Sequence, residues 1–248
     1  MAAIREKIPR VQDPDTITRM MDISACRLSS LADAWHVLCT HTSGVSWAGR
    51  KIVKNQFDLA RYFYLLHALR PDVVVETGLQ GGGSALFFLD ALRMLRLPDT
   101  LYVGVDLDAR MALEAVQGHG AENPVVLVSG DCLADATLRE VTPLVDGRRS
   151  LIVLDSVHSE AHVAEELRLY APLCTAGSCL VVEDTDHGGR PILGNYGPSA
   201  AEAVEAFLAP GGLGRALGFE HDAESEARFG PFTVSPGAWL VRRPKEMP

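Results

Sequence analysis

The sequence predicts one large α/β domain built around a mostly parallel sheet of seven strands, with helices on both faces and an antiparallel last strand. Apolar runs and helical patterns alternate from residue 56 onwards, which is typical of such a sheet. Runs such as Leu151-Ile-Val-Leu154 are apolar on both faces, as strands covered by helices on each side are. A glycine-rich turn follows the first run, and the 248 residues are enough to bury a full core.

The elements are expected in a regular order, beginning with an N-terminal extension over residues 1–55. This extension is irregular apart from a helical pattern near 17–39, and we expect it to cover the site or to contact another subunit of a homo-oligomer. The main domain then occupies 56–248 and opens with a helix over 56–69, which Pro71 stops.

Seven strands follow this helix, and further helices separate the first five of them. A helix over 198–209 has Pro198 near its start and Gly211 after its end, the positions where these residue types are enriched. The last strand comes after a loop too short for a crossover helix, so it is expected to run antiparallel. The expected strands are 72–76, 101–106, 124–128, 150–155, 178–183, 217–221 and 237–242.

The composition argues against several classes of partner. A net charge of −9 disfavours nucleic acid or an anionic membrane. No apolar run approaches the ~18 residues that a membrane span needs, and the start of the chain shows no signal peptide, so we expect a cytoplasmic protein. The five cysteines are scattered without a C-x-x-C pair and are expected to be reduced thiols.

The glycine-rich turn reads Glu76-Thr-Gly-Leu-Gln-Gly-Gly-Gly-Ser84 and leads from the first strand into a helix. Backbone N–H groups and a helix N-terminus can approach a ligand closely at such a turn. A dinucleotide fingerprint needs G-x-G-x-x-G, whereas Leu79 and Gln80 follow Gly78 here. The pattern E-x-G-x-x-G-G is instead the one with which methyltransferases hold S-adenosylmethionine (SAM). A tight turn without a ligand is the alternative.

Acidic residues lie at or just beyond the ends of four strands, at the edge where open α/β sheets bind ligands. They are Glu76, Asp106, Asp131 and Asp155. Asp106 is placed to accept both ribose hydroxyls of a nucleoside, and Asp131 lies where the adenine would be. A single acid at a strand end is commonly a helix cap, an alternative that stays open for Asp131 above all.

Three carboxylates, Asp155, Glu183 and Asp184, are expected to converge if the fourth and fifth strands are neighbours about 4.8 Å apart. Bare anions so close together would have strongly shifted pKa values, and a divalent cation removes the repulsion. Oxygen ligands select a hard metal, first Mg²⁺ and then Mn²⁺ or Ca²⁺. Alternatively, Glu183 and Asp184 are loop acids that pair with Arg190 or cap backbone N–H groups.

His158 lies three residues after Asp155, at the mouth of the expected metal site, where it can accept a proton from a metal-bound hydroxyl. His162 follows at i,i+4, but Ser159 stands where the zinc protease motif needs a glutamate. We therefore expect His162 to be a structural partner on its helix. His187 is a weaker candidate for the base.

These segments together carry a resemblance to a known family. The segments are Glu76-Thr-Gly-x-x-Gly-Gly-Gly-Ser-Ala, Gly104-Val-Asp-Leu-Asp, Gly130-Asp131, Leu154-Asp-Ser-x-His-Ser-x-x-His-Val-x-x-Glu-Leu and Val182-Glu-Asp-Thr. As a set they resemble the cephalosporin hydroxylase family, which is similar to the metal-dependent rhamnosyl and macrolide-sugar O-methyltransferases. The resemblance covers about residues 45–210 and implies a Rossmann-like class I methyltransferase fold.

The resemblance also implies two cofactors, SAM and Mg²⁺. The catalytic candidates are His158, as the general base, and Asp155. The residues implied for SAM are Glu76, Gly78, Ser84, Asp106 and Asp131, with Thr77 and Gln80 from the same turn. The residues implied for Mg²⁺ are Asp155, Glu183 and Asp184.

We therefore expect a SAM- and Mg²⁺-dependent O-methyltransferase whose small-molecule acceptor carries neighbouring hydroxyls, such as a sugar or diol in a natural-product pathway. Only 6% of the residues are aromatic, which favours a sugar over a flat catechol. A catechol-type acceptor remains one alternative, and a protein that binds SAM without turnover is another. A third is a metal-dependent oxygenase in which His158, Glu160 and His187 hold iron.

Overall fold

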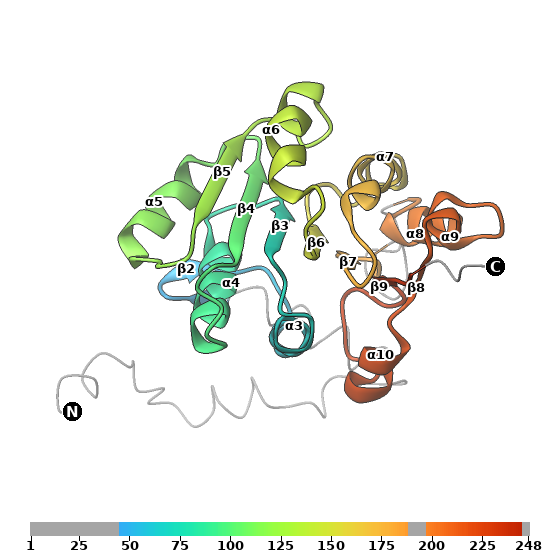
Figure 1. Cartoon of the computed structure of the whole chain (residues 1–248), viewed down its shortest axis with the longest axis horizontal. Helices are drawn as coiled ribbons and strands as arrows, with labels where there is room; N and C mark the ends of the chain where they lie inside the picture. The colour runs from blue at the N-terminus through green and yellow to red at the C-terminus, as the bar shows by residue number, and fades with distance from the viewer. Residues whose placement is uncertain (1–44, 188–196, 245–248) are drawn as a thin grey trace, which may run out of the picture.

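The fold is seen in a computed structural model, which describes residues 45–187 and 197–244. The helical pattern near 17–39 and Arg190 lie outside these residues. Seven strands form one sheet in the order β5-β4-β3-β6-β7-β9-β8 (Figure 1). The strands are β3 Val73–Thr77, β4 Leu101–Asp106, β5 Val125–Ser129, β6 Ser150–Leu154, β7 Cys179–Val182, β8 Phe219–His221 and β9 Trp239–Arg242.

Six of these strands run in one direction, and β9 runs antiparallel between β7 and β8. The register pairs Thr77 with Leu154 and Leu154 with Val182, so β3, β6 and β7 end level at one edge of the sheet. The predicted fold class is confirmed, because both the parallel sheet and the antiparallel last strand are present. This edge is where the acidic residues predicted from the sequence meet.

Helices cover both faces of the sheet, as the apolar strands predicted (Figure 1). Helices α3, α4 and α5 pack on the face that carries Val74, and α6, α7 and α8 pack on the face that carries Val73 and Val75. Successive side chains of a strand point to opposite faces, so each strand serves both cores. No helix within the described ranges is long and apolar enough to span a bilayer. The helices are α3 Gln56–Leu69, α4 Gly83–Met94, α5 Arg110–His119, α6 Asp135–Val145, α7 Glu160–Tyr170, α8 Ala200–Leu208, α9 Leu213–Leu217 and α10 Ala223–Phe229, with a 3₁₀ turn at Ala171–Leu173.

A short hairpin precedes α3, in the segment expected to be irregular. Its strands are β1 Ser46–Trp47 and β2 Arg50–Lys51. The Trp47 indole donates a hydrogen bond to Asp90 Oδ2 at 2.9 Å and meets the ring of Phe87 edge-on at 5.2 Å. Because Asp90 and Phe87 lie on α4, the hairpin is fixed against the main body beside the start of that helix.

The connection between β8 and β9 contains the seven-residue helix α10, which the sequence analysis treated as a plain loop. This helix packs on α3, where Arg61 Nε donates to Ser225 Oγ at 2.6 Å and Tyr64 contacts the ring of Phe229. Helix α10 is not a crossover connection between parallel strands, and β9 therefore pairs with β8 in the antiparallel direction.

Candidate active site

The glycines of the turn after β3 are required by close approaches of the protein's own backbone. Gly78 has φ +83°, and a Cβ there would lie 2.0 Å from the carbonyl oxygen of Asp155. Gly82 also has φ +83°, and its Cβ would lie 2.8 Å from Ala112 Cα on α5. A Cβ on Gly83 would lie 2.2 Å from the Lys51 carbonyl oxygen. The turn is therefore packed against β6, α5 and the hairpin, in addition to facing a cavity.

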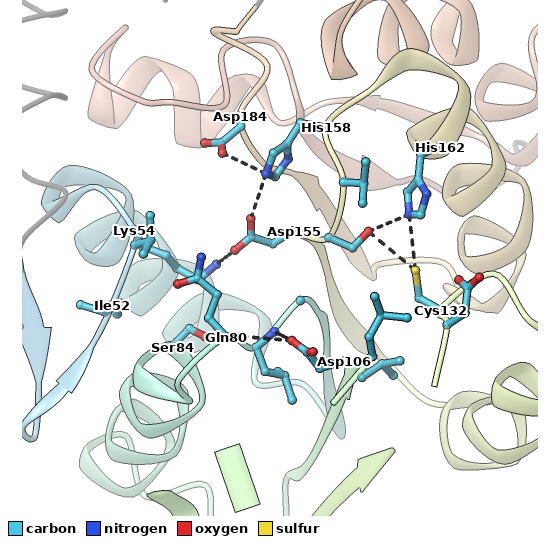
Figure 2. A pocket seen from close by; sticks show the side chains of 18 of the residues that line it. Ile52, Lys54, Gln80, Ser84, Asp106, Cys132, Asp155, His158, His162 and Asp184 are labelled. Atoms are coloured by element: carbon cyan, nitrogen blue, oxygen red, sulfur yellow. Dashed lines mark hydrogen bonds and ion pairs between the residues drawn. The ribbon is translucent and has the colours of Figure 1, made fainter. Parts of the chain in front are cut away.

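A cavity of about 380 Å³ opens at the carboxyl ends of β3, β4, β5 and β6 (Figure 2). Its volume lies in the range of small-molecule sites, about 300–1,000 Å³. Five of the seven residues predicted to bind the cofactor line this cavity. They are Gly78, Gln80, Ser84, Asp106 and Asp131.

Asp106 and Asp131 both hold backbone N–H groups in this structure. Asp106 Oδ2 accepts hydrogen bonds from the N–H groups of Leu79 at 2.7 Å and Gln80 at 3.1 Å, which fixes the turn. Asp131 Oδ1 accepts from the Leu133 N–H at 2.9 Å. Gln80 has φ +44°, a left-handed conformation that is strained for a non-glycine residue, and it lies on the cavity wall.

Glu76 and Thr77 are fully buried and are not among the residues that line the cavity. Glu76 Oε2 accepts a short hydrogen bond from the Tyr102 hydroxyl. Burial raises the pKa of Glu76, against the opposing effect of the Lys54 ammonium. Thr77 Oγ1 donates to Glu166 Oε1 at 2.7 Å. Both residues thus lie behind the cavity wall, and their contact with a cofactor stays a prediction.

Lys54 is the residue that binds the strand-end acids together, and the sequence analysis did not anticipate it. Its Nζ lies 2.8 Å from Asp155 Oδ2, 2.7 Å from Glu183 Oε1 and 3.1 Å from Glu76 Oε1. The side chain is only 1% exposed. Burial alone would lower the pKa of Lys54, but these three carboxylates raise it well above its ordinary value. Lys54 therefore remains a buried cation shared by three strands.

Glu183 faces this lysine and lies outside the cavity lining. Its Oε1 also accepts a hydrogen bond of 2.6 Å from the Tyr62 hydroxyl on α3, and the residue is 2% exposed. The sequence predicted that Asp155 and Glu183 would converge, and they do so around the Lys54 ammonium. The role of Glu183 as a metal ligand stays a prediction.

Asp155, His158 and Asp184 meet on the cavity wall (Figure 2), each offering one ligand atom within 4.8 Å of the others. His158 Nε2 lies 3.2 Å from Asp184 Oδ2 and 4.0 Å from Asp155 Oδ1. Asp184 has φ +57°, a left-handed conformation that is uncommon for a residue other than glycine. The predicted base therefore lies beside two of the three predicted metal ligands.

His187 and Asp186 also lie close to Asp184. His187 Nε2 is 3.9 Å from Asp184 Oδ2, and its ring meets that of His158 edge-on at 5.5 Å. Asp186 is 1% exposed, and burial raises the pKa of its carboxyl to about 8. The ligand clusters found within the described residues do not include Glu160, which the iron alternative required.

The charges of the site fit an added divalent cation. Glu76, Asp155 and Glu183 are grouped around Lys54, and Asp184 lies near Asp155, so four carboxylates are close to a single ammonium. Burial first, and then the negative charge of the neighbouring Glu183, raise the pKa of Asp155 well above its ordinary value. Oxygens of Asp155 and Asp184 are ligands that Mg²⁺ accepts.

Three residues of this network were not predicted from the sequence: Lys54, Tyr62 and Tyr102. Each tyrosine lies in an apolar stretch, where it looks like ordinary core, and its hydroxyl reaches a buried carboxylate. The signal that could have found Lys54 is a charge argument, because acids at the ends of three adjoining strands require a nearby cation.

Comparison with known proteins identifies the family. A profile described as "Rhamnosyl O-methyltransferase/CmcI" matches residues 39–243. The chain is 32% identical over 202 residues to a rhamnosyl O-methyltransferase of Mycobacterium leprae (strain TN), covering 80% of this chain and 83% of that protein. A rhamnosyl O-methyltransferase of Mycobacterium bovis (strain BCG / Pasteur 1173P2) is 31% identical over 200 residues, covering 79% and 78% respectively.

Solved structures agree on the fold. A structure of CmcI with Mg and SAM gives a TM-score of 0.58 at 20% identity, over 82% of this chain and 77% of that one. A structure of CmcI with SAH gives a TM-score of 0.56 at 18% identity, over 82% of this chain and 84% of that one. The chain therefore belongs to the rhamnosyl O-methyltransferase/CmcI family and is a SAM-dependent O-methyltransferase.

Proposed function

We propose that this enzyme is Mg²⁺-dependent and methylates a hydroxyl of a sugar or of a diol-containing natural-product intermediate. The observation that carries the proposal is the group of Asp155, His158 and Asp184 on the wall of a cavity of cofactor size. The names of the relatives, which are rhamnosyl O-methyltransferases, support a sugar acceptor.

The residues divide into two sets under this proposal. Asp155 and Asp184 would hold Mg²⁺, with Glu183 as the third proposed ligand, although Glu183 Oε1 is already engaged by Lys54 and Tyr62. The cavity residues proposed to hold SAM are Gly78, Gln80, Ser84, Asp106 and Asp131, with Glu76 and Thr77 behind them.

The chemistry requires a methyl donor, a polarised acceptor and a base. When bound, SAM supplies an electrophilic methyl group, and Mg²⁺ lowers the pKa of an acceptor hydroxyl and orients it. His158 Nε2 takes the hydroxyl proton as the new C–O bond forms and the C–S bond breaks. The Asp184 carboxylate, 3.2 Å away, then stabilises the imidazolium. General-base catalysis of this kind contributes about 10²–10⁴-fold.

The acceptor is expected to offer two neighbouring oxygens, because a chelated diol fixes one hydroxyl in line with the methyl group. A vicinal diol of a deoxysugar and a catechol both meet this requirement. The low aromatic content of the chain, 6%, favours the sugar. A free methyl rhamnoside is the simplest probe of this acceptor class.

Mass spectrometry on a panel of acceptors tests the proposal. Methyl rhamnoside and other deoxysugar glycosides should gain one methyl group in the presence of SAM, and catechol should react more slowly. An excess of chelator should abolish turnover, and added Mg²⁺ should restore it. Full activity in excess chelator would contradict the metal's role, and methylation of catechols alone would contradict the sugar assignment.

A further inference from the structure

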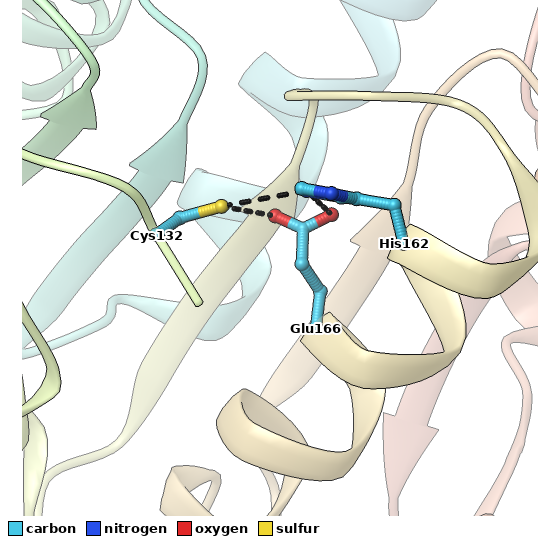
Figure 3. A group of neighbouring side chains, drawn as sticks. All are labelled: Cys132, His162 and Glu166. Atoms are coloured by element: carbon cyan, nitrogen blue, oxygen red, sulfur yellow. Dashed lines mark hydrogen bonds and ion pairs between the residues drawn. The ribbon is translucent and has the colours of Figure 1, made fainter. Parts of the chain in front are cut away.

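A second group of ligand-type side chains lies close together (Figure 3), and two of its three members line the same cavity. This group, here called the thiol cluster, consists of Cys132, His162 and Glu166. Cys132 follows β5, while His162 and Glu166 lie four residues apart on α7 and so project from one face of that helix. None of the three is needed by the proposed methyl transfer.

The donor atoms of the three side chains lie close enough together to share one metal ion. Cys132 Sγ lies 3.5 Å from His162 Nε2 and 3.5 Å from Glu166 Oε1, and His162 Nε2 lies 3.8 Å from Glu166 Oε2. Tetrahedral Zn²⁺, with bonds of about 2.3 Å to sulfur and about 2.0–2.2 Å to nitrogen and oxygen, separates its ligand atoms by about 3.3–3.7 Å. The two 3.5 Å spacings from Cys132 Sγ therefore match edges of the tetrahedron, while the 3.8 Å spacing from His162 Nε2 is to the other carboxylate oxygen of Glu166. One donor atom from each of the three residues lies within 4.8 Å of the others.

Glu166 supplies a second, independent observation. The residue is 1% exposed, and its Oε2 makes no hydrogen bond within the described part of the chain. Its other oxygen accepts a hydrogen bond of 2.7 Å from Thr77 Oγ1, which orients the carboxylate toward the cluster. An outer hydrogen bond of this kind commonly positions a metal-ligating carboxylate.

Ser156 lies next to the thiol cluster, on the cavity wall. Ser156 Oγ lies 2.9 Å from His162 Nε2 and 3.6 Å from Cys132 Sγ, and these three residues line the cavity together. Ser156 or a water can complete the coordination. Without a metal, the same contacts form a plain hydrogen-bond network in which His162 is the structural partner expected from the sequence.

The donor types select the metal. Thiolate and imidazole ligands favour Zn²⁺ or Co²⁺ over the hard ions Mg²⁺ and Ca²⁺, which take oxygen ligands. The thiol cluster and the Asp155–Asp184 group are therefore suited to different ions.

We propose that Cys132, His162 and Glu166 bind one Zn²⁺, which ties the loop after β5 to α7 and leaves its fourth position open to the cavity. Binding converts the Cys132 thiol to a zinc thiolate and releases one proton to solvent. The site is structural, because it joins the loop after β5 to the helix after β6, two strands that are separated in the sheet by β4 and β3. It is independent of the proposed acceptor.

Metal binding to the full-length protein tests this proposal. Protein stripped with a chelator and then dialysed against Zn²⁺ should retain about one zinc per chain by elemental analysis, and its melting temperature should rise. Substitution with Co²⁺ should give the visible absorption of a tetrahedral ion and a thiolate-to-cobalt charge-transfer band. Cys132→Ser should abolish that band and the bound zinc, and His162→Gln should weaken zinc binding at least tenfold.

Matched variants separate this site from other metal ligands. The double variant Cys26→Ser, Cys39→Ser removes two other thiols and should keep both the zinc and the band. Asp184→Asn alters the proposed Mg²⁺ site and should also keep the bound zinc and the charge-transfer band. The test therefore measures zinc binding and does not depend on whether the variant transfers methyl groups. Absence of bound zinc in the wild type, or equal zinc retention in Cys132→Ser and the wild type, would overturn the proposal and leave the hydrogen-bond network as the explanation. If Cys132→Ser fails to fold, His162→Gln decides between these outcomes.

Discussion

Replacing Lys54 by methionine tests the electrostatic arrangement at the centre of the site. The ammonium lies 2.7, 2.8 and 3.1 Å from carboxylate oxygens of Glu183, Asp155 and Glu76, and the side chain is 1% exposed. Methionine keeps most of the side-chain volume and removes the charge, so the acids lose the cation that they share. Removing one partner of a buried ion pair costs about 3–5 kcal/mol. That is a large part of the roughly 5–15 kcal/mol by which domains are stable.

The loss of stability in this variant should depend on pH. Burial already raises the pKa of Glu76 and Asp155, and removal of the ammonium raises both further. A carboxyl whose pKa is higher in the folded than in the unfolded state stabilises the fold at low pH, and this contribution is lost as the pH rises through the folded pKa. The variant should therefore resemble the wild type most closely near pH 5. Above that pH the difference from the wild type should grow by about 1.4 kcal/mol per pH unit, as expected when the acids together retain one more proton in the folded variant than in the folded wild type.

Chemical unfolding followed by tryptophan fluorescence measures both effects. At pH 8 the unfolding free energy should fall by about 3–5 kcal/mol and the melting temperature by about 6–20 °C, since 1 kcal/mol corresponds to about 2–4 °C at this chain length. Lys51→Met is the matched control, because Lys51 is exposed on β2 three residues earlier. A loss below about 1 kcal/mol at pH 8, or an equal loss at pH 5, would refute the reasoning.

Three further predictions concern single side chains. His158→Gln should lower kcat by about 10²–10⁴-fold while calorimetry shows unchanged SAM affinity, and an unchanged kcat would exclude His158 as the base. Gly78→Ala should destabilise the fold by about 3 kcal/mol or more, because its Cβ would lie 2.0 Å from a carbonyl oxygen. Gly81→Ala, whose Cβ would come no closer than 3.9 Å to another residue, should change stability by less than about 0.5 kcal/mol, and equal effects would contradict the packing argument. Burial raises the pKa of Asp58 to about 7, so its protonated form, which stabilises the fold, is lost between pH 5 and pH 8. In Asp58→Asn the unfolding free energy should therefore decrease less over this pH range than in the wild type. A slope equal to that of the wild type would show that Asp58 is not responsible.

The sheet was predictable from the sequence because each buried strand carries its own local signal. The expected strand 72–76 appears as Val73–Thr77, and the expected strand 178–183 appears as Cys179–Val182. Buried parallel strands are apolar throughout, so their position depends little on the rest of the chain. The helix α10 was not predicted, because its seven residues are stabilised by contacts with α3, which lies about 160 residues earlier in the chain.

The site was predictable in its acids and not in its cation. Asp155 and Glu183 end neighbouring strands, and the strand order follows from the α/β pattern, so their meeting could be expected. Lys54 lies 101 and 129 residues away from them, in a segment with no periodic pattern. Contacts over such separations are set by the closed fold rather than by local propensity. The sequence predicted a positive charge beside these acids and assigned it to a metal. The structure shows the Lys54 ammonium between Asp155 and Glu183, and the metal stays a prediction.

The position of β9 has a consequence for how the chain acquires its catalytic edge. β9 follows β8 in the chain yet lies between β7 and β8, so β8 can join the sheet only after β9 has paired with Val181 and its neighbours. Until then β7 is an open edge, with unpaired backbone groups available to another chain. In a nascent or truncated chain without Trp239, the ring of Tyr62 would lose its contact with the Trp239 ring. The Tyr62 hydroxyl is the group that donates a hydrogen bond to Glu183. Assembly of the acidic centre is thus coupled to the arrival of a strand some 55 residues further along.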